Sequence, residues 1–239
     1  MKMGVVWLLI GLVAGASCTY EMTSEELLDK AIAYHDPDGS WSAFNGELNL
    51  SFEGPAAPDG DTYVSINLPE SFFYTKRERG DNVIEYEVKE ETCTVVFNGR
   101  REFTDGEIKE HRLNCEGAKR MRNYYTYLYG LPMKLKDAGT FIDEAIEQTT
   151  FKGKEYLVLN VRYDEHVGSD IWRFYFDPKT YAMEVYQFFK PDEEGNINPE
   201  SGEYIMLSEE KMMNGIKMPR IRSWYFNKGD EFLGTDTLN

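Results

Sequence analysis

The sequence is short of basic residues. It has 26 Lys and Arg residues against 42 Asp and Glu residues in a chain of 239, so the formal net charge is −16. Binding to nucleic acid needs clustered cationic side chains in excess, and this charge therefore excludes a nucleic-acid partner. Hydrophobic residues make up 41% and aromatic residues 14% of the chain, which excludes disorder over its whole length.

Motifs of the common enzyme classes are also missing. The nucleophile elbow G-x-S-x-G, the phosphate loop G-x-x-x-x-G-K-[ST] and the dinucleotide motif G-x-G-x-x-G do not occur. The histidines, His35, His111 and His166, match no zinc spacing. His111 and Cys115 lie one helical turn apart, but a disulfide at Cys115 would consume the thiol. We therefore predict no catalytic residue and no cofactor, with a periplasmic hydrolase as the weaker alternative.

Two acidic segments resemble cation-binding loops only in part. Asp36 and Asp38 precede Gly39, but an EF-hand needs a third ligand before its glycine and a later Glu, and both are missing. A second loop carries more oxygen ligands without a recognisable spacing: Asp192, Glu193, Glu194, Asn196 and Asn198. We predict a helix-to-strand turn at the first segment, a solvated loop at the second, and no metal site.

Residues 1–17 have the features of a secretory signal peptide. Lys2 is followed by an uncharged run from Gly4 to Ala16. This run is too short to span a hydrocarbon core of about 30 Å, and it ends in small residues. Two processing sites compete: cleavage after Ala16 fits an A-x-A site, whereas residues 15–18 (GASC) resemble a bacterial lipobox with Gly in place of the usual Leu, Val or Ile.

Lipidation of Cys18 is the favoured interpretation, because a lone Cys directly after small residues has no other role. Several acyl chains on one Cys would anchor the protein stably, and no later stretch is apolar enough to span a membrane. Loss of Lys2 with the signal peptide leaves 25 basic against 42 acidic residues, a net charge of −17. We predict an exported protein on the periplasmic side of the envelope, anchored by lipid to the outer membrane in preference to the inner one.

Cys93 and Cys115 then remain as a pair, 22 residues apart. In an oxidising periplasm such a pair forms a disulfide that contributes about 3 kcal/mol to stability. Two buried free thiols are the alternative. A zinc site would need a nearby CxxC or a pair of histidines. We favour the disulfide.

Two amphipathic helices are expected. Thr23 and Glu26 form a capping box that starts the first helix, over residues 23–33, and a segment with Pro and Gly ends it. The second covers residues 116–129, where Met121, Tyr124, Tyr125 and Leu128 recur at helical spacing. Residues 137–150 fit a short helix or a strand equally well.

Most of the remaining chain alternates between apolar and polar residues, as half-buried strands do. Asn98-Gly99 and Asn214-Gly215 are type I′ hairpin signals. About ten strands in one antiparallel meander would tend to curl. We therefore predict an α+β, mostly β fold over residues 18–239 as one domain: a curled antiparallel sheet, or incomplete barrel, whose concave face the two helices cover.

Four phrases carry a resemblance to known families. Residues 24–31 (SEELLDKA) resemble the first helix of the periplasmic lipoprotein carriers and receptors of the LolA, LolB and LppX type. Residues 35–41 (HDPDGSW), 123–135 (NYYTYLYGLPMKL) and 174–180 (FYFDPKT) resemble a family of Gram-negative envelope proteins of unknown function. The resemblance covers most of the mature chain and implies no activity. By analogy of architecture it implies the fold of the lipoprotein carriers.

An apolar cavity beneath the second helix is the candidate site. If that helix closes the half-barrel, large apolar surfaces with few polar groups would suit an acyl chain. The expected lining is Tyr124, Tyr125, Leu128, Leu157, Leu159, Trp172, Phe174 and Phe176. We predict a non-catalytic, lipid-anchored protein that binds a lipid or a lipidated polypeptide. The alternative is a structural or interaction lipoprotein of the outer membrane with a filled core and no ligand.

Overall fold

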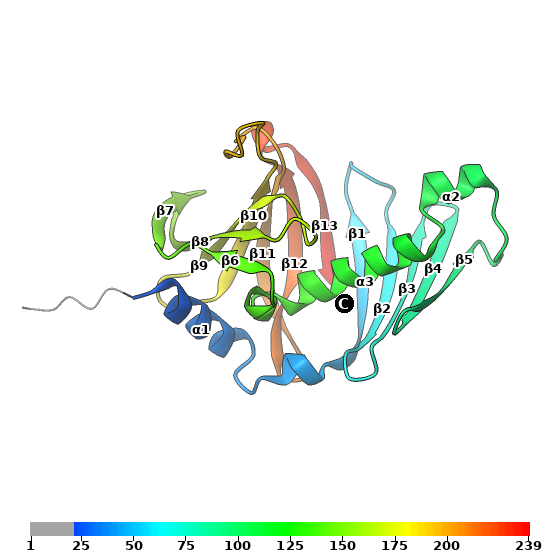
Figure 1. Ribbon diagram of the computed structural model, residues 1–239, viewed down its shortest axis with the longest axis horizontal. Helices are drawn as coiled ribbons and strands as arrows, with labels where there is room; N and C mark the ends of the chain where they lie inside the picture. The colour runs from blue at the N-terminus through cyan, green and yellow to red at the C-terminus, as the bar shows by residue number, and fades with distance from the viewer. Residues whose placement is uncertain (1–21) are drawn as a thin grey trace, which may run out of the picture.

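The computed structural model describes residues 22–239 (Figure 1). The predicted signal peptide and Cys18 lie outside these residues. The helices are α1 (Ser24–His35), α2 (Asp105–His111) and α3 (Cys115–Gly130), with 3-10 turns η1 (Ser40–Ala43), η2 (Met133–Lys136) and η3 (Lys228–Asp230). Over residues 22–239, no helix has both the length and the apolar character needed to cross a membrane.

One antiparallel sheet contains all the named strands of the described chain. The strands are β1 (Asn45–Glu53), β2 (Gly60–Asn67), β3 (Phe72–Arg79), β4 (Asn82–Lys89), β5 (Thr92–Phe97), β6 (Thr140–Ile142), β7 (Glu147–Phe151), β8 (Lys154–Tyr163), β9 (Ile171–Phe176), β10 (Met183–Phe189), β11 (Glu203–Met213), β12 (Ile216–Phe226) and β13 (Phe232–Leu238). Their order is β5-β4-β3-β2-β1-β13-β12-β11-β10-β9-β8-β6, and β7 also pairs with β8. The sheet curls around α3 without closing (Figure 1), which confirms the predicted fold class.

The first helix begins where its sequence signals place it. The Thr23 hydroxyl accepts from the Glu26 N–H at 3.2 Å, and the Thr23 N–H donates to the Glu26 carboxylate at 2.9 Å. These bonds satisfy donors that helix geometry leaves free. Leu27, Leu28 and Ala31 are buried on one face. The helix ends at His35, two residues later than predicted, and packs against β12.

Three tight two-residue turns have positive φ at both residues. Asn98 and Gly99 have φ of 48° and 76°, and Asn214 and Gly215 have 51° and 84°, as a type I′ turn requires. The Asn214-Gly215 hairpin joins β11 to β12 as predicted, whereas Asn98-Gly99 forms the predicted turn but turns the chain back only as far as an isolated bridge between Phe97 and Arg100. Lys152 and Gly153, with φ of 50° and 83°, join β7 to β8 in the same way, although their sequence lacks the Asn that marked the other two.

Two apolar layers result, one on each face of the sheet. The main core joins α1, α3 and the concave face, and includes Leu48, Ile66 and Phe174. A smaller core on the convex face consists of Tyr156, Val158, Tyr175 and Val185, with Phe151 packed against it. The strands β8, β9 and β10 thus bury side chains on both faces.

Candidate functional site

Helix α3 is fixed at both ends above the concave face. At its start, Asn114 accepts from the Gly117 N–H at 2.8 Å, and Cys115 forms a disulfide with Cys93 of β5, with 5.6 Å between their Cα atoms. At its end, Gly130 lies directly against Trp41, because a Cβ at this position would be 2.4 Å from the indole ring. The helix therefore crosses the concave face of the sheet with both ends held in place, and there is space beneath its middle.

A cleft of about 570 Å³ lies between α3 and the concave face. We call it the aromatic cleft. Strands from both halves of the sheet and seven residues of α3 line it. Its apolar lining comprises Leu50, Phe52, Ala56, Ala57, Met121, Tyr124, Tyr125, Tyr127, Leu128, Tyr129, Trp172, Tyr186, Phe188, Trp224 and Leu233.

The residues expected to line a cavity divide into two groups. Tyr124, Tyr125, Leu128 and Trp172 line the aromatic cleft. The other four lie in the packed core, where their side chains are 0–9% exposed: Leu157, Leu159, Phe174 and Phe176. Trp172 and Phe174 stack on each other at 6.0 Å and mark the boundary between the two groups.

Tyr124 shows that the space beneath α3 is accessible. Its side chain is 38% exposed although it lines the cleft under the helix. The surrounding protein raises the pKa of its phenol well above the ordinary value, chiefly by desolvation. An aromatic residue that lines the cleft and keeps more than a third of its surface accessible to solvent forms part of the cleft wall and not of the packed core.

Charged side chains also line the aromatic cleft, and sequence reasoning missed them. Arg222 of β12 is 1% exposed, donates to the Leu128 carbonyl at 3.1 Å and lies 4.0 Å from the Tyr129 ring. Asp236 of β13 accepts from the Trp224 indole N–H at 2.9 Å, and burial raises the pKa of this carboxyl. Strand alternation was the available signal, because Arg222 shares the inward side of β12 with buried Ile216 and Met218.

The phrase at residues 35–41 has a structural role away from the cleft. The His35 Nε2 accepts from the Met183 N–H at 2.9 Å, so its Nδ1 carries the proton and donates to the Lys217 carbonyl at 2.8 Å. Burial lowers the pKa of this imidazole. Both Asp36 carboxylate oxygens accept backbone N–H groups, from Ser40 at 2.7 Å and Trp41 at 2.9 Å. Asp36 thus caps η1, as the predicted helix-to-strand turn requires.

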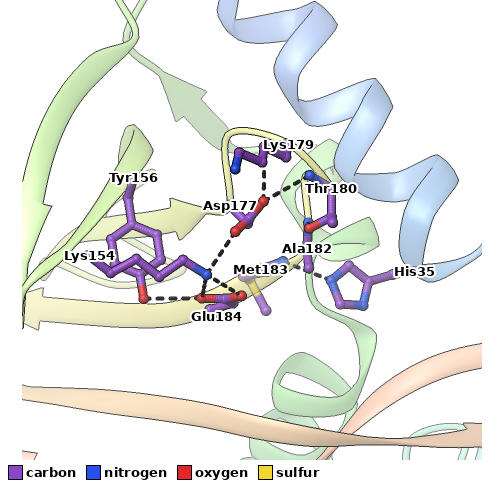
Figure 2. A network of polar contacts seen from close by, with 9 residues as sticks. All are labelled: His35, Lys154, Tyr156, Asp177, Lys179, Thr180, Ala182, Met183 and Glu184. Carbon is purple, nitrogen blue, oxygen red and sulfur yellow. Dashed lines mark hydrogen bonds and ion pairs between the residues drawn. The ribbon is translucent and has the colours of Figure 1, made fainter.

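Residues 174–180 also have a structural role, because Asp177, Lys179 and Thr180 take part in a network of polar contacts (Figure 2). Asp177 accepts the N–H groups of Lys179 and Thr180, each at 2.9 Å, and pairs with Lys154 at 2.7 Å. These contacts, led by the bond from Lys154, hold the pKa of the Asp177 carboxyl well below its usual range. Lys154 also pairs with Glu184 at 2.7 Å. The network ties β8, the β9–β10 turn and β10 together.

The remaining motifs do not assemble a reactive site in the described chain. Cys115 is in the disulfide, so His111 has no thiol beside it. The ring of His111 packs against Phe97 at 4.7 Å. Across residues 22–239, no three His, Cys, Asp or Glu side chains gather as a metal site would need.

The fold and the cleft define a class of protein in which one helix spans a curled antiparallel sheet and leaves an aromatic-lined space beneath it. The chain belongs to a family of unknown function, DUF6503, whose model matches residues 2–239. This match confirms the membership that the sequence phrases indicated. No curated protein sequence matches the chain.

Two solved structures have a similar architecture. One is a LolA superfamily protein from Nitrosomonas europaea, with 8% identity over 92% of each chain and a TM-score of 0.48. The other is a DUF1329 family protein from Desulfovibrio piger, with 9% identity over 90% of each chain and a TM-score of 0.46.

Proposed function

We propose that this protein binds a lipid, or the acyl chain of a lipidated polypeptide, in the aromatic cleft. The observation that carries the proposal is the exposure of Tyr124, 38%, inside a cleft of about 570 Å³. That volume lies within the range of roughly 300–1,000 Å³ typical of small-molecule sites. Water is the default occupant of such a space, and an apolar chain that replaces it removes aromatic surface from water.

The walls of the cleft support an apolar occupant. Trp172 packs on Phe188 with ring centres 5.0 Å apart, and Tyr186 meets Trp224 edge-on at 6.3 Å. Burial of apolar surface contributes about 25 cal/mol per Å². An extended acyl chain between α3 and these rings would gain this free energy along its whole length.

We also propose that the protein acts at the membrane surface, on the periplasmic side of the envelope. The signal peptide and the lipobox-like sequence at residues 15–18 support export and lipid attachment at Cys18. A protein anchored to the membrane through a lipid on Cys18 would meet acyl chains at the membrane surface. Radioactive palmitate should label the protein in cells and should not label Cys18→Ser, and equal labelling of both would contradict attachment at this residue.

Uptake of a fluorescent fatty acid by delipidated protein tests the binding. Ala57→Trp should block the cleft from an exposed loop and weaken uptake at least about tenfold, because the indole takes the place of the ligand. Ala145→Trp is the matched control, since Ala145 is exposed and outside the cleft. Absence of both uptake and co-purified lipid would contradict the proposal and favour the filled, ligand-free alternative.

A further inference from the structure

A second cleft adjoins the aromatic one. It has a volume of about 410 Å³ and lies where the start of α3 crosses β3 and β4. The two share Arg77, Arg79, Arg120 and Met121. We call the second one the arginine cleft, because Arg112 is also part of its lining.

These arginines lack acidic partners. Within residues 22–239, none of the four lies within ion-pairing distance of a carboxylate, although the chain carries a net charge of −16. The Nε of Arg77 is buried without a hydrogen-bond partner, and its Nη1 contacts the Met121 sulfur at 3.6 Å. Arg79 donates to the backbone carbonyls of Glu78 and Asp61, at 2.7 and 3.2 Å.

Their positive charge is only partly offset by the acidic groups nearby. Glu110 is the acidic residue in the lining of the arginine cleft. Asp236, in the aromatic cleft, is already bonded to the Trp224 indole. Burial and, after it, the adjacent charge of Arg77 lower the pKa of Arg79, whereas the charges of Asp236 and Asp61 act in the opposite direction without cancelling this effect.

The acidic lining residues Asp170 and Glu203 lie at the other end of the aromatic cleft. They lie at the starts of β9 and β11. In the sheet, β2, β1, β13 and β12 lie between β3 and β11, and β9 lies beyond β11. The combined space therefore has a direction: aromatic along its middle, acidic at one end and cationic at the end nearest β3.

We propose that the arginine cleft binds the anionic group, a carboxylate or a phosphate, of an amphiphile whose acyl chain occupies the aromatic cleft. This inference rests on the proposed function and adds the chemical class of the ligand. A guanidinium matches the two oxygens of a carboxylate or phosphate with parallel N–H groups. The unpartnered Nε of Arg77 is the donor that such a group would satisfy.

Displacement of a fluorescent fatty acid by three competitors tests the inference: dodecanoate, its methyl ester and inorganic phosphate. The acid should displace the probe at a concentration at least about tenfold lower than the ester, because only the acid gains charge-assisted bonds. Phosphate alone should not displace it at these concentrations. In the double variant Arg77→Gln, Arg79→Gln, the acid should lose its advantage while the ester binds as before.

Arg162→Gln is the matched control, since Arg162 is exposed and lies outside both clefts. Unchanged binding of the ester shows that the double variant is folded. Equal affinity of unmodified protein for acid and ester would overturn the inference and leave the proposed function intact. Displacement by phosphate at the concentration of the acid would overturn it in favour of a site for free anions. If neither acid nor ester bound, the proposed function would fail as well.

Discussion

The packed core and the aromatic cleft use similar side chains for different ends. In β8–β10, the aromatic rings Phe174 and Tyr175 point to opposite faces and are 0% and 1% exposed, because apolar layers cover both sides. Beneath α3, Tyr124 is 38% exposed. A single helix covers only a stripe of a curled sheet, and the remainder of its concave face lines a cleft. Aromatic side chains are therefore packed on both faces of the sheet at Phe174 and Tyr175, but they form the wall of a cleft beneath the middle of α3.

Truncation of one aromatic ring in the packed core and of one in the cleft wall should show the largest difference. Phe174→Ala removes a fully buried side chain and should lower the free energy of unfolding by about 3–5 kcal/mol. Trp172→Ala removes a ring that already borders open space, so we expect roughly half that loss. Urea unfolding of both variants measures the difference. Equal losses would mean that the cleft wall is as tightly packed as the core.

Removal of the disulfide should loosen the attachment of α3 above the cleft. It joins β5 to the start of α3 and closes a loop of 22 residues, so its loss should lower the free energy of unfolding by about 3 kcal/mol. Thermal unfolding with and without reductant measures this. The variant with Cys93→Ser and Cys115→Ser is the control and should be as unstable without reductant as the reduced protein. If reductant had no effect on the unmodified protein, the two cysteines would not be bonded in solution.

A methyl group at Gly130 should disturb the other end of α3. Its Cβ would meet the Trp41 ring at 2.4 Å, and such overpacking costs about 1–3 kcal/mol. Ala otherwise favours a helix over Gly by about 1 kcal/mol, so a net loss would identify the clash. Gly168→Ala is the matched control: a Cβ there meets nothing within 4 Å, and thermal unfolding should be nearly unchanged. A stabilised Gly130→Ala would show that Trp41 moves aside freely.

The smallest effect is expected in the pH dependence of the packed core, where His35 lies buried. Burial lowers the pKa of His35 from 6.5, so the unfolded chain takes up a proton at a higher pH than the folded protein. The contribution to stability is full above 6.5 and declines as the pH falls below that value. In urea unfolding between pH 7 and 5, His35→Gln should remove this decline, whereas His166→Gln, at an exposed position, should keep it. A decline that persists in His35→Gln would come from another group.

Local signals predicted most of the fold. The capping box at Thr23 and the Asn-Gly turns each depend on a few neighbouring residues, and the structure has all of them. A second capping box, formed by Thr104 and Glu107, starts α2, a helix that is absent from the expected elements. The ambiguous residues 137–150 form β6 and β7, which pair with successive parts of β8. Their state depends on a partner that their own sequence does not contain.

The cleft could be predicted only in part. Alternation identifies the side of a strand that faces inward, and Leu159, Trp172 and Phe174 do face the concave side. It does not give the distance to the opposite layer, which decides between a packed contact and a wall. Arg77 and Arg79 lie at alternate positions of β3 in a segment that also contains Lys76 and Glu78. The sequence of this segment fits a site for an anionic headgroup, but it fits paired surface charges better.

The pairing of β13 with β1 has a consequence for how the chain folds. Leu50 lies opposite Leu238, and β13 also pairs with β12, so it joins the strands before α3 to those after it. Within the described chain, backbone pairing between the two sets runs through this strand alone. Contacts so distant in sequence form slowly. The two sets of strands can each form early, but the sheet stays in two pieces until β13, the last of the described strands along the chain, pairs with both β1 and β12.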